Sequence, residues 1–164
     1  MFRLLLISAL STLALFSAPQ AESAGFLNDL SGNWSGGGRA YLPKMGEVSA
    51  DWRLKITGGD SQIAMRGSCG LLVFRQPLGF TIKNSGGNKY VGTYTGSKTG
   101  PAKLQGTLEG NRLVLTITWG GLVNGDRTAQ MVLQRIGPNT FAQTVNDNVG
   151  GKYRSTSNFV FKRG

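Results

Sequence analysis

The amino-acid sequence predicts an all-β protein, an antiparallel meander of about eight to ten strands that closes into an up-and-down barrel. Three observations lead to this prediction. Apolar residues recur at every second position through most of the chain, which is the spacing of a strand with one buried face. Short stretches rich in Gly, Asn and Asp separate these segments. A helical spacing of apolar residues is almost absent.

The first residues differ from the rest and have the order of a secretory signal peptide. Arg3 supplies one positive charge, positions 4–16 are mostly apolar, and Ala21-Glu22-Ser23 is the nearest match to a cleavage site. The apolar run is shorter than the roughly 20 residues of a membrane-spanning helix. We therefore expect residues 1–24 to be removed on export. Residues 25–164 are then a single domain without a transmembrane segment, either periplasmic or extracellular.

The exported part is expected to start with a short lead-in, Gly25 to Leu30, and to continue as strands. The clearest alternation places Leu113, Leu115 and Ile117 on one face, with threonines on the other. In the same way, Trp52, Leu54 and Ile56 alternate with charged and polar residues. The other strands with this pattern lie around Ile63–Met65, Tyr90–Tyr94, Leu104–Leu108, Ala129–Leu133, Phe141–Val145 and Phe159–Phe161.

The connections between these strands are short. Pairs such as Asn124-Gly125 suit tight hairpins, because primed turns require positive φ. Connections of this length cannot hold crossover helices, so neighbouring strands are expected to pair antiparallel. Closure hides both the apolar face and the unpaired edges of such a sheet. These considerations favour a barrel over the alternative, a two-sheet β-sandwich.

The composition is strongly basic, with 18 Lys and Arg against 8 Asp and Glu and a net charge of +10. Such a charge favours anionic partners such as lipopolysaccharide, phospholipid or acidic polysaccharide. The export signal argues against nucleic acid as the partner. Scattered charges are also explained by solubility alone, so only the fold can gather them into a patch. The candidate anion-binding residues are Arg53, Lys55, Lys83, Lys89, Lys98 and Lys103.

Cys69 is the only cysteine, so no disulfide can form within the chain. It shares a strand register with Ile63 and Met65 on the apolar face. This register favours a structural role for Cys69, as a small buried side chain, over a role as a reactive thiol.

The start of the first strand, Gly32-Asn33-Trp34, followed by a continuous meander, resembles the Gly-x-Trp start of the calycin superfamily, the lipocalin and fatty-acid-binding-protein barrels. The resemblance implies that Trp34 plugs the closed end of a barrel beneath a basic residue, Arg154 or Lys162. The wider pattern is similar to small exported bacterial β-proteins of unassigned activity. It includes Arg66-Gly67-Ser68-Cys69 and the repeated unit Leu104–Leu108.

Catalytic and cofactor-binding motifs are scarce in the sequence. The chain has no His, which removes the commonest general base and most zinc sites. Glu47 and Asp51 are the two acidic residues closest in the sequence, and on a strand residues four positions apart lie about 13 Å from each other. Glycosidase carboxylates are about 5 to 9.5 Å apart. We therefore expect a non-catalytic protein with no cofactor.

Two classes of function remain open. In the first, the protein is an exported binding protein of the bacterial envelope that holds a small apolar or amphipathic ligand, or an anionic envelope component. In the second, it is a structural or inhibitory interaction module with a solid barrel interior. An apolar cavity of a few hundred Å³ favours the first class. The candidate cavity residues are Trp52, Tyr90, Tyr94, Trp119 and Phe141.

Overall fold

The computed structural model describes residues 25–71 and 73–164, and the expected signal peptide, residues 1–24, lies outside this part. The described residues form one short helix and ten strands. No helix among them is long and apolar enough to cross a membrane. The elements are α1 (Phe26–Leu30), β1 (Gly32–Leu42), β2 (Gly46–Gly59), β3 (Gln62–Leu71), β4 (Phe74–Gly86), β5 (Lys89–Thr95), β6 (Ala102–Glu109), β7 (Arg112–Val123), β8 (Asp126–Gly137), β9 (Thr140–Val149) and β10 (Lys152–Arg163).

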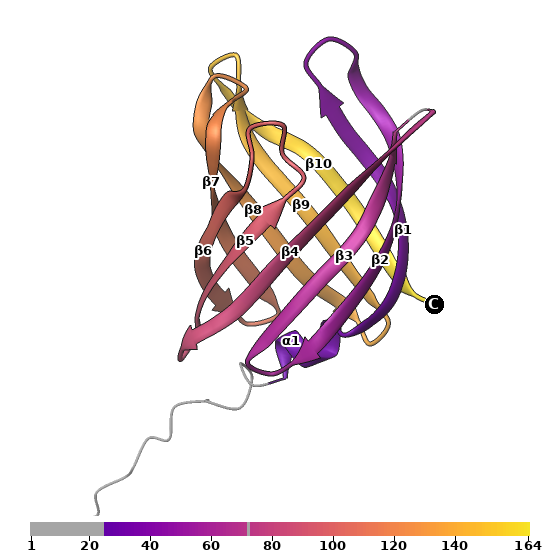
Figure 1. Ribbon diagram of the computed structural model, residues 1–164, viewed down its shortest axis with the longest axis vertical. Helices are drawn as coiled ribbons and strands as arrows, with labels where there is room; N and C mark the ends of the chain where they lie inside the picture. Colours follow the sequence, from indigo (N-terminus) through magenta and orange to yellow (C-terminus); the bar gives the residue numbers. More distant parts are fainter. Residues whose placement is uncertain (1–24, 72) are drawn as a thin grey trace, which may run out of the picture.

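The strands form a closed antiparallel barrel (Figure 1). Each strand pairs with its neighbours in the chain, and β1 also pairs with β10, in a register that runs from Trp34 opposite Arg163 to Ala40 opposite Ser157. This last pairing removes both sheet edges. The predicted meander and its closure are therefore confirmed, and the sandwich alternative is wrong.

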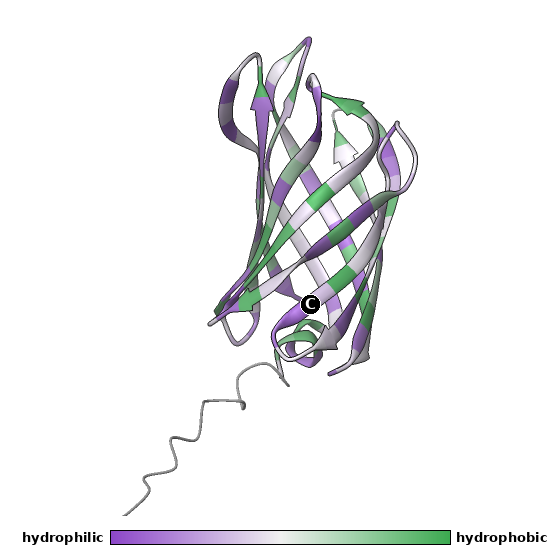
Figure 2. Ribbon diagram, turned by 90° about the vertical axis from the view of Figure 1, so that its left-hand side faces the viewer, coloured by the Kyte–Doolittle hydropathy of each residue, from purple (hydrophilic) through white to green (hydrophobic). Residues whose placement is uncertain are grey.

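The alternation read from the sequence is present in the strands. In β2, Trp52, Leu54 and Ile56 are buried while the residues between them are exposed. Figure 2 shows hydrophobic and hydrophilic residues alternating along the ribbons. The turn between β7 and β8 has Asn124 at φ 54° and Gly125 at φ 102°, as the hairpin chemistry predicts.

Because the strands alternate in direction, the turns fall at two ends of the barrel. We call the end that carries α1 and the β2–β3, β4–β5, β6–β7 and β8–β9 turns the closed end (Figure 1). The opposite end carries the β1–β2, β3–β4, β5–β6, β7–β8 and β9–β10 connections, and we call it the open end.

Helix α1 and Trp34 fill the closed end. Phe26, Leu27 and Leu30 are buried, so the expected lead-in is in fact a plug of the barrel. The indole Nε1 of Trp34 donates a hydrogen bond to the carbonyl oxygen of Leu30 at 2.8 Å. The guanidinium of Arg163 lies 4.3 Å from the centre of the Trp34 ring, and its Nη2 donates to the carbonyl oxygen of Asp29 at 2.7 Å. The helix is therefore tied to both the first and the last strand.

The basic residue over Trp34 is thus Arg163, and neither Arg154 nor Lys162 occupies that place. Arg154 lies near the open end, 4.7 Å from the centre of the Tyr41 ring. Lys162 is exposed, because it alternates with the inward-facing Phe161. Arg163 lies two positions after the inward-facing Phe161, so it is on the same face of β10. This spacing in the sequence favours Arg163 over Lys162 as the basic residue above Trp34.

Stacked aromatic rings continue the packing above the plug. Phe141 stacks on Phe161 with ring centres 4.6 Å apart and meets Trp34 edge to face at 4.8 Å. Phe161 lies against β1 at Gly36, where a Cβ atom would come within 2.6 Å of its ring carbon Cδ1. A glycine at this position therefore lets the ring approach the strand.

We expect Trp34→Ala to lower the free energy of unfolding by about 3–5 kcal/mol. The substitution removes a large buried side chain, its hydrogen bond to Leu30 and its stacking contact with Arg163. Urea unfolding followed by circular dichroism measures the change. The matched control is Tyr153→Ala, since Tyr153 is 66% exposed. Equal, small effects of the two substitutions would show that Trp34 does not hold the closed end together.

Candidate functional site

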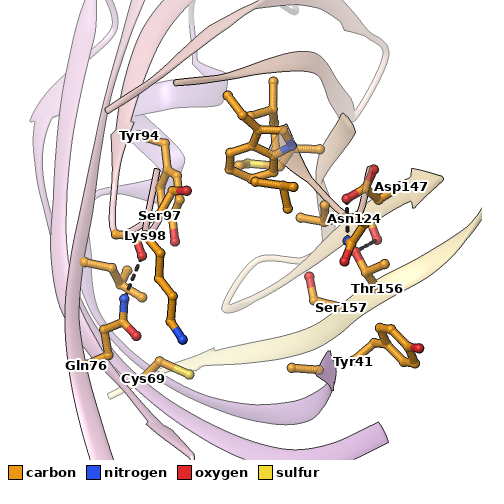
Figure 3. Close-up of a pocket in the computed structure, with 18 of the residues that line it drawn as sticks. Tyr41, Cys69, Gln76, Tyr94, Ser97, Lys98, Asn124, Asp147, Thr156 and Ser157 are labelled. Carbon is orange, nitrogen blue, oxygen red and sulfur yellow. Dashed lines mark hydrogen bonds between the residues drawn. The ribbon is translucent and has the colours of Figure 1, made fainter. Parts of the chain in front are cut away.

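The interior above the aromatic packing contains a cavity of about 420 Å³ that opens at the open end. Its apolar walls come from strands all around the barrel. Cys69 and Met131 add sulfur atoms to this lining. Figure 3 shows the polar residues of the cavity, with Lys98, Gln76 and Tyr94 on one wall and Asn124 and Asp147 on the other. The aromatic residues that line it are Tyr41, Trp52, Phe80, Tyr94, Trp119 and Phe159.

Alternation along the strands brings these side chains inward. The aromatic walls contact one another at the edges of the cavity: Phe80 and Tyr94 have ring centres 5.4 Å apart, and Tyr94 and Trp119 are 6.1 Å apart. Trp52 packs on Phe159 at 5.1 Å. Two groups of ring-to-ring contacts therefore fix the positions of the aromatic side chains that line the cavity.

Three buried polar atoms of the cavity lining have no hydrogen-bond partner among the described residues. They are the indole Nε1 atoms of Trp52 and Trp119 and the amide oxygen Oε1 of Gln143. Trp52, Trp119 and Gln143 are 7%, 9% and 4% exposed, respectively. Leaving a buried polar group unpaired costs about 1–3 kcal/mol. Two donors and one acceptor are thus left unpaired in residues that line the cavity.

Asp147 is the one buried carboxylate in the described part of the chain, and it also lines the cavity. Its Oδ2 accepts a hydrogen bond from Asn124 Nδ2 at 2.7 Å, and its Oδ1 accepts one from the backbone N–H of Asn148 at 2.8 Å. Burial raises the pKa of Asp147 above its ordinary value, although the two hydrogen bonds act in the opposite direction. Asp126 nearby raises it further.

Cys69 and Tyr94 are two further titratable groups of the cavity lining. Burial raises the pKa of the Cys69 thiol to about 11, with the carboxylate of Asp51 adding to the effect and Arg75 opposing it. Burial likewise raises the pKa of Tyr94 to about 12. Both groups are neutral at physiological pH. Cys69 is buried, as its strand register predicts, and it also lines the cavity.

The five aromatic candidates divide into two groups. Trp52, Tyr94 and Trp119 line the cavity. Tyr90 and Phe141 lie in the filled part of the core instead, and both are fully buried. The alternation tells which side chains point inward, but it does not tell how far each lies from the plug.

The basic candidates do not form one patch. Lys98 lines the cavity mouth, whereas Lys83, Lys89 and Lys103 are exposed on β4, β5 and β6. Lys83 and Lys103 are opposite Val91 and Thr93, which lie two residues apart on β5.

Arg53 and Lys55 belong to a different wall of the barrel. Both are exposed on β2, and Lys55 is directly opposite Arg66 on β3. The ion pairs of the described residues include neither of them. Arg53, Lys55 and Arg66 are therefore a second group of basic residues, separate from the lysines of β4, β5 and β6.

Among the cavity residues that sequence reasoning missed are the polar residues Gln143, Asn124 and Asp147. Gln143 and Asp147 continue the inward register of Phe141, so polar residues on an apolar face were a usable signal. The Asn124-Gly125 pair predicts a turn, and nothing in that pattern indicates a cavity residue. Within the described residues, no group of three or more His, Cys, Asp or Glu is placed to hold a metal ion.

No protein-family model matches the chain, and no curated protein matches it. Among solved structures, the barrel is similar to Rv2717c from M. tuberculosis, with a TM-score of 0.64 and 15% identity over 90% of this chain and 98% of that one. It is also similar to the S-type phycobiliprotein lyase CPES from Guillardia theta, with a TM-score of 0.60 and 11% identity over 85% of this chain and 90% of that one. At these identities the similarity concerns the fold alone.

We expect Cys69 to react slowly with a thiol reagent in the native protein, and the rate to rise about tenfold per pH unit until the pH approaches 11. The reason is that only the thiolate reacts, and burial keeps the thiol protonated. Labelling of protein unfolded in urea is the control and should level off near pH 9.0, the ordinary value for a thiol. A native rate that levels off at or below pH 9 would show an exposed, activated thiol.

Proposed function

We propose that this chain is an exported binding protein that holds a small amphipathic molecule in the open half of its barrel. The observation that carries this proposal is the set of unpartnered polar atoms of Trp52, Trp119 and Gln143 inside an aromatic cavity. The cavity of about 420 Å³ therefore supports the binding class over the solid interaction module.

The chemistry of the lining describes the ligand. The aromatic walls suit an apolar body. The two indole N–H groups suit oxygen acceptors on the ligand, and Gln143 Oε1 suits a donor. Lys98 at the mouth has no ion pair within the described residues, so it is suited to an acidic group that remains near solvent. An anionic amphiphile of the envelope combines these properties.

We propose binding without catalysis. The one carboxylate of the cavity, Asp147, is tied by hydrogen bonds to the side chain of Asn124 and the backbone N–H of Asn148. The structural neighbour named as a phycobiliprotein lyase is the reason to test for turnover. Chemical change of a bound compound, detected by mass spectrometry and lost in Asp147→Asn, would contradict a purely binding role.

Export to the periplasm or the cell exterior is part of the proposal and rests on residues 1–24. The full-length chain expressed in a bacterial host should be recovered outside the cytoplasm, with a mature N-terminus between Glu22 and Gly25 by intact mass. Replacing apolar residues of positions 4–16 with charged ones should leave it unprocessed. A cytoplasmic protein that keeps Met1 would contradict export.

The binding site is tested with 1-anilinonaphthalene-8-sulfonate, an apolar aromatic probe with an acidic group. We expect saturable binding at one site, weakened about tenfold by Val145→Trp, because the added indole fills the cavity. Val160→Trp is the matched control, since Val160 is 41% exposed on the outside of β10. Trp119→Phe should weaken binding about fivefold by removing one donor. Unchanged binding to Val145→Trp would place the probe outside the cavity.

A further inference from the structure

The open end carries most of the large exposed hydrophobic side chains of the described residues. Val73 and Phe74 at the β3–β4 connection are 89% and 75% exposed, and Met45 in the β1–β2 turn is 56% exposed. Leu122 near the end of β7 and Tyr153 at the start of β10 are 68% and 66% exposed. We call these five residues the rim. They come from four separate hairpins that share one end only because the chain is a meander.

Positive charge is interleaved with the rim. Lys44 precedes Met45 in the chain and Lys152 precedes Tyr153, while Lys98 stands on the β5–β6 connection. All three lysines are exposed, and the ion pairs of the described residues include none of them. Among the carboxylates of this end, Glu47 and Asp51 form ion pairs with arginines and Asp147 is buried, which leaves Asp126 as the one carboxylate of the described residues there without an ion pair and not buried. The three unpaired lysines outnumber it, so the unpaired charge of the rim is positive.

We propose that the rim docks onto the surface of an anionic lipid bilayer. The apolar side chains enter the boundary between headgroups and acyl chains, and the three lysines pair with anionic headgroups. In this orientation the mouth of the cavity faces the membrane, because Leu122 and Lys98 line the cavity as well as belonging to this end. Docking does not require the proposed ligand, so the two proposals stand or fall separately.

A bilayer fits the rim better than a second copy of the chain. A rim-to-rim dimer would bring lysine against lysine, since Glu47 and Asp51 are already paired with arginines and Asp126 alone cannot balance three lysines. The apolar side chains also stand on separate hairpin tips around an opening, rather than on one flat patch. A fluid surface accommodates separate tips, whereas a rigid partner needs a contiguous complementary face.

The wall formed by Arg53, Lys55, Arg66 and Lys162 is the competing surface. It is basic and exposed, but it has no large exposed hydrophobic side chain beyond Val160 nearby on β10. Attraction there would be electrostatic alone and would be screened by salt. The rim combines charge with apolar side chains, so its binding should persist in part at high salt.

The experiment is co-sedimentation of residues 25–164, which contain the whole barrel, with vesicles of phosphatidylcholine alone or mixed with phosphatidylglycerol. We expect binding to the mixed vesicles, weakened about tenfold by Val73→Ser combined with Phe74→Ser. Ile136→Ser is the matched control, because Ile136 is 51% exposed but lies near the closed end. Lys44→Gln combined with Lys152→Gln should weaken binding at low salt and reduce its salt dependence.

Four outcomes would overturn the proposal. The first two are equal binding to neutral vesicles and binding that the Val73 and Phe74 substitutions leave unchanged. The third is loss of binding in the Arg53→Gln, Lys55→Gln variant, which would place the binding surface on the basic wall. The fourth is a dimer in sedimentation velocity that the rim substitutions dissociate. Val145→Trp keeps the rim intact and should bind vesicles like the parent. A failure of cavity binding is therefore distinguishable from a failure of docking.

Discussion

The antiparallel pairing of β1 with β10 is the constraint on which the other features of this barrel depend. Once these two strands are joined, every backbone edge of the sheet is satisfied and each strand has one face inside and one outside. The register of this pairing also sets Trp34 directly opposite Arg163. The stacked pair then holds α1 across one end, so closing the sheet and plugging the barrel involve the same two strands.

The plug divides the interior into two unequal environments. Near α1, rings such as Phe141 and Phe161 stack closely enough to fill the space between the strands. Farther along, the rings of Trp52, Phe80 and Trp119 stand around a cavity, and the two indole nitrogens have no hydrogen-bond partner among the described residues. A barrel of this size can be solid or hollow. Here the interior is filled near the plug and hollow farther from it. The hollow part supports a ligand site at the open end.

The outside of the barrel distributes charge in a way that composition does not reveal. Arg53, Lys55 and Arg66 gather on one wall because β2 and β3 are adjacent and in register. At the open end, lysines lie beside exposed apolar side chains, and Glu47 and Asp51 are paired with arginines. These two surfaces have different physical chemistry. The first can attract anions only through charge, and the second combines charge with hydrophobic contact.

The sequence by itself determined the fold class, the order of strands and the inward face of nearly all of them, because period-two alternation and short turns are local properties. It also placed Trp34, Cys69, Trp52, Tyr94 and Trp119 inside. Only the tertiary structure decided that Arg163 covers Trp34, that Tyr90 and Phe141 belong to the filled core, and that Lys98 lies apart from the other lysines. These facts depend on the register between distant strands and on depth along the barrel axis, and local periodicity determines neither.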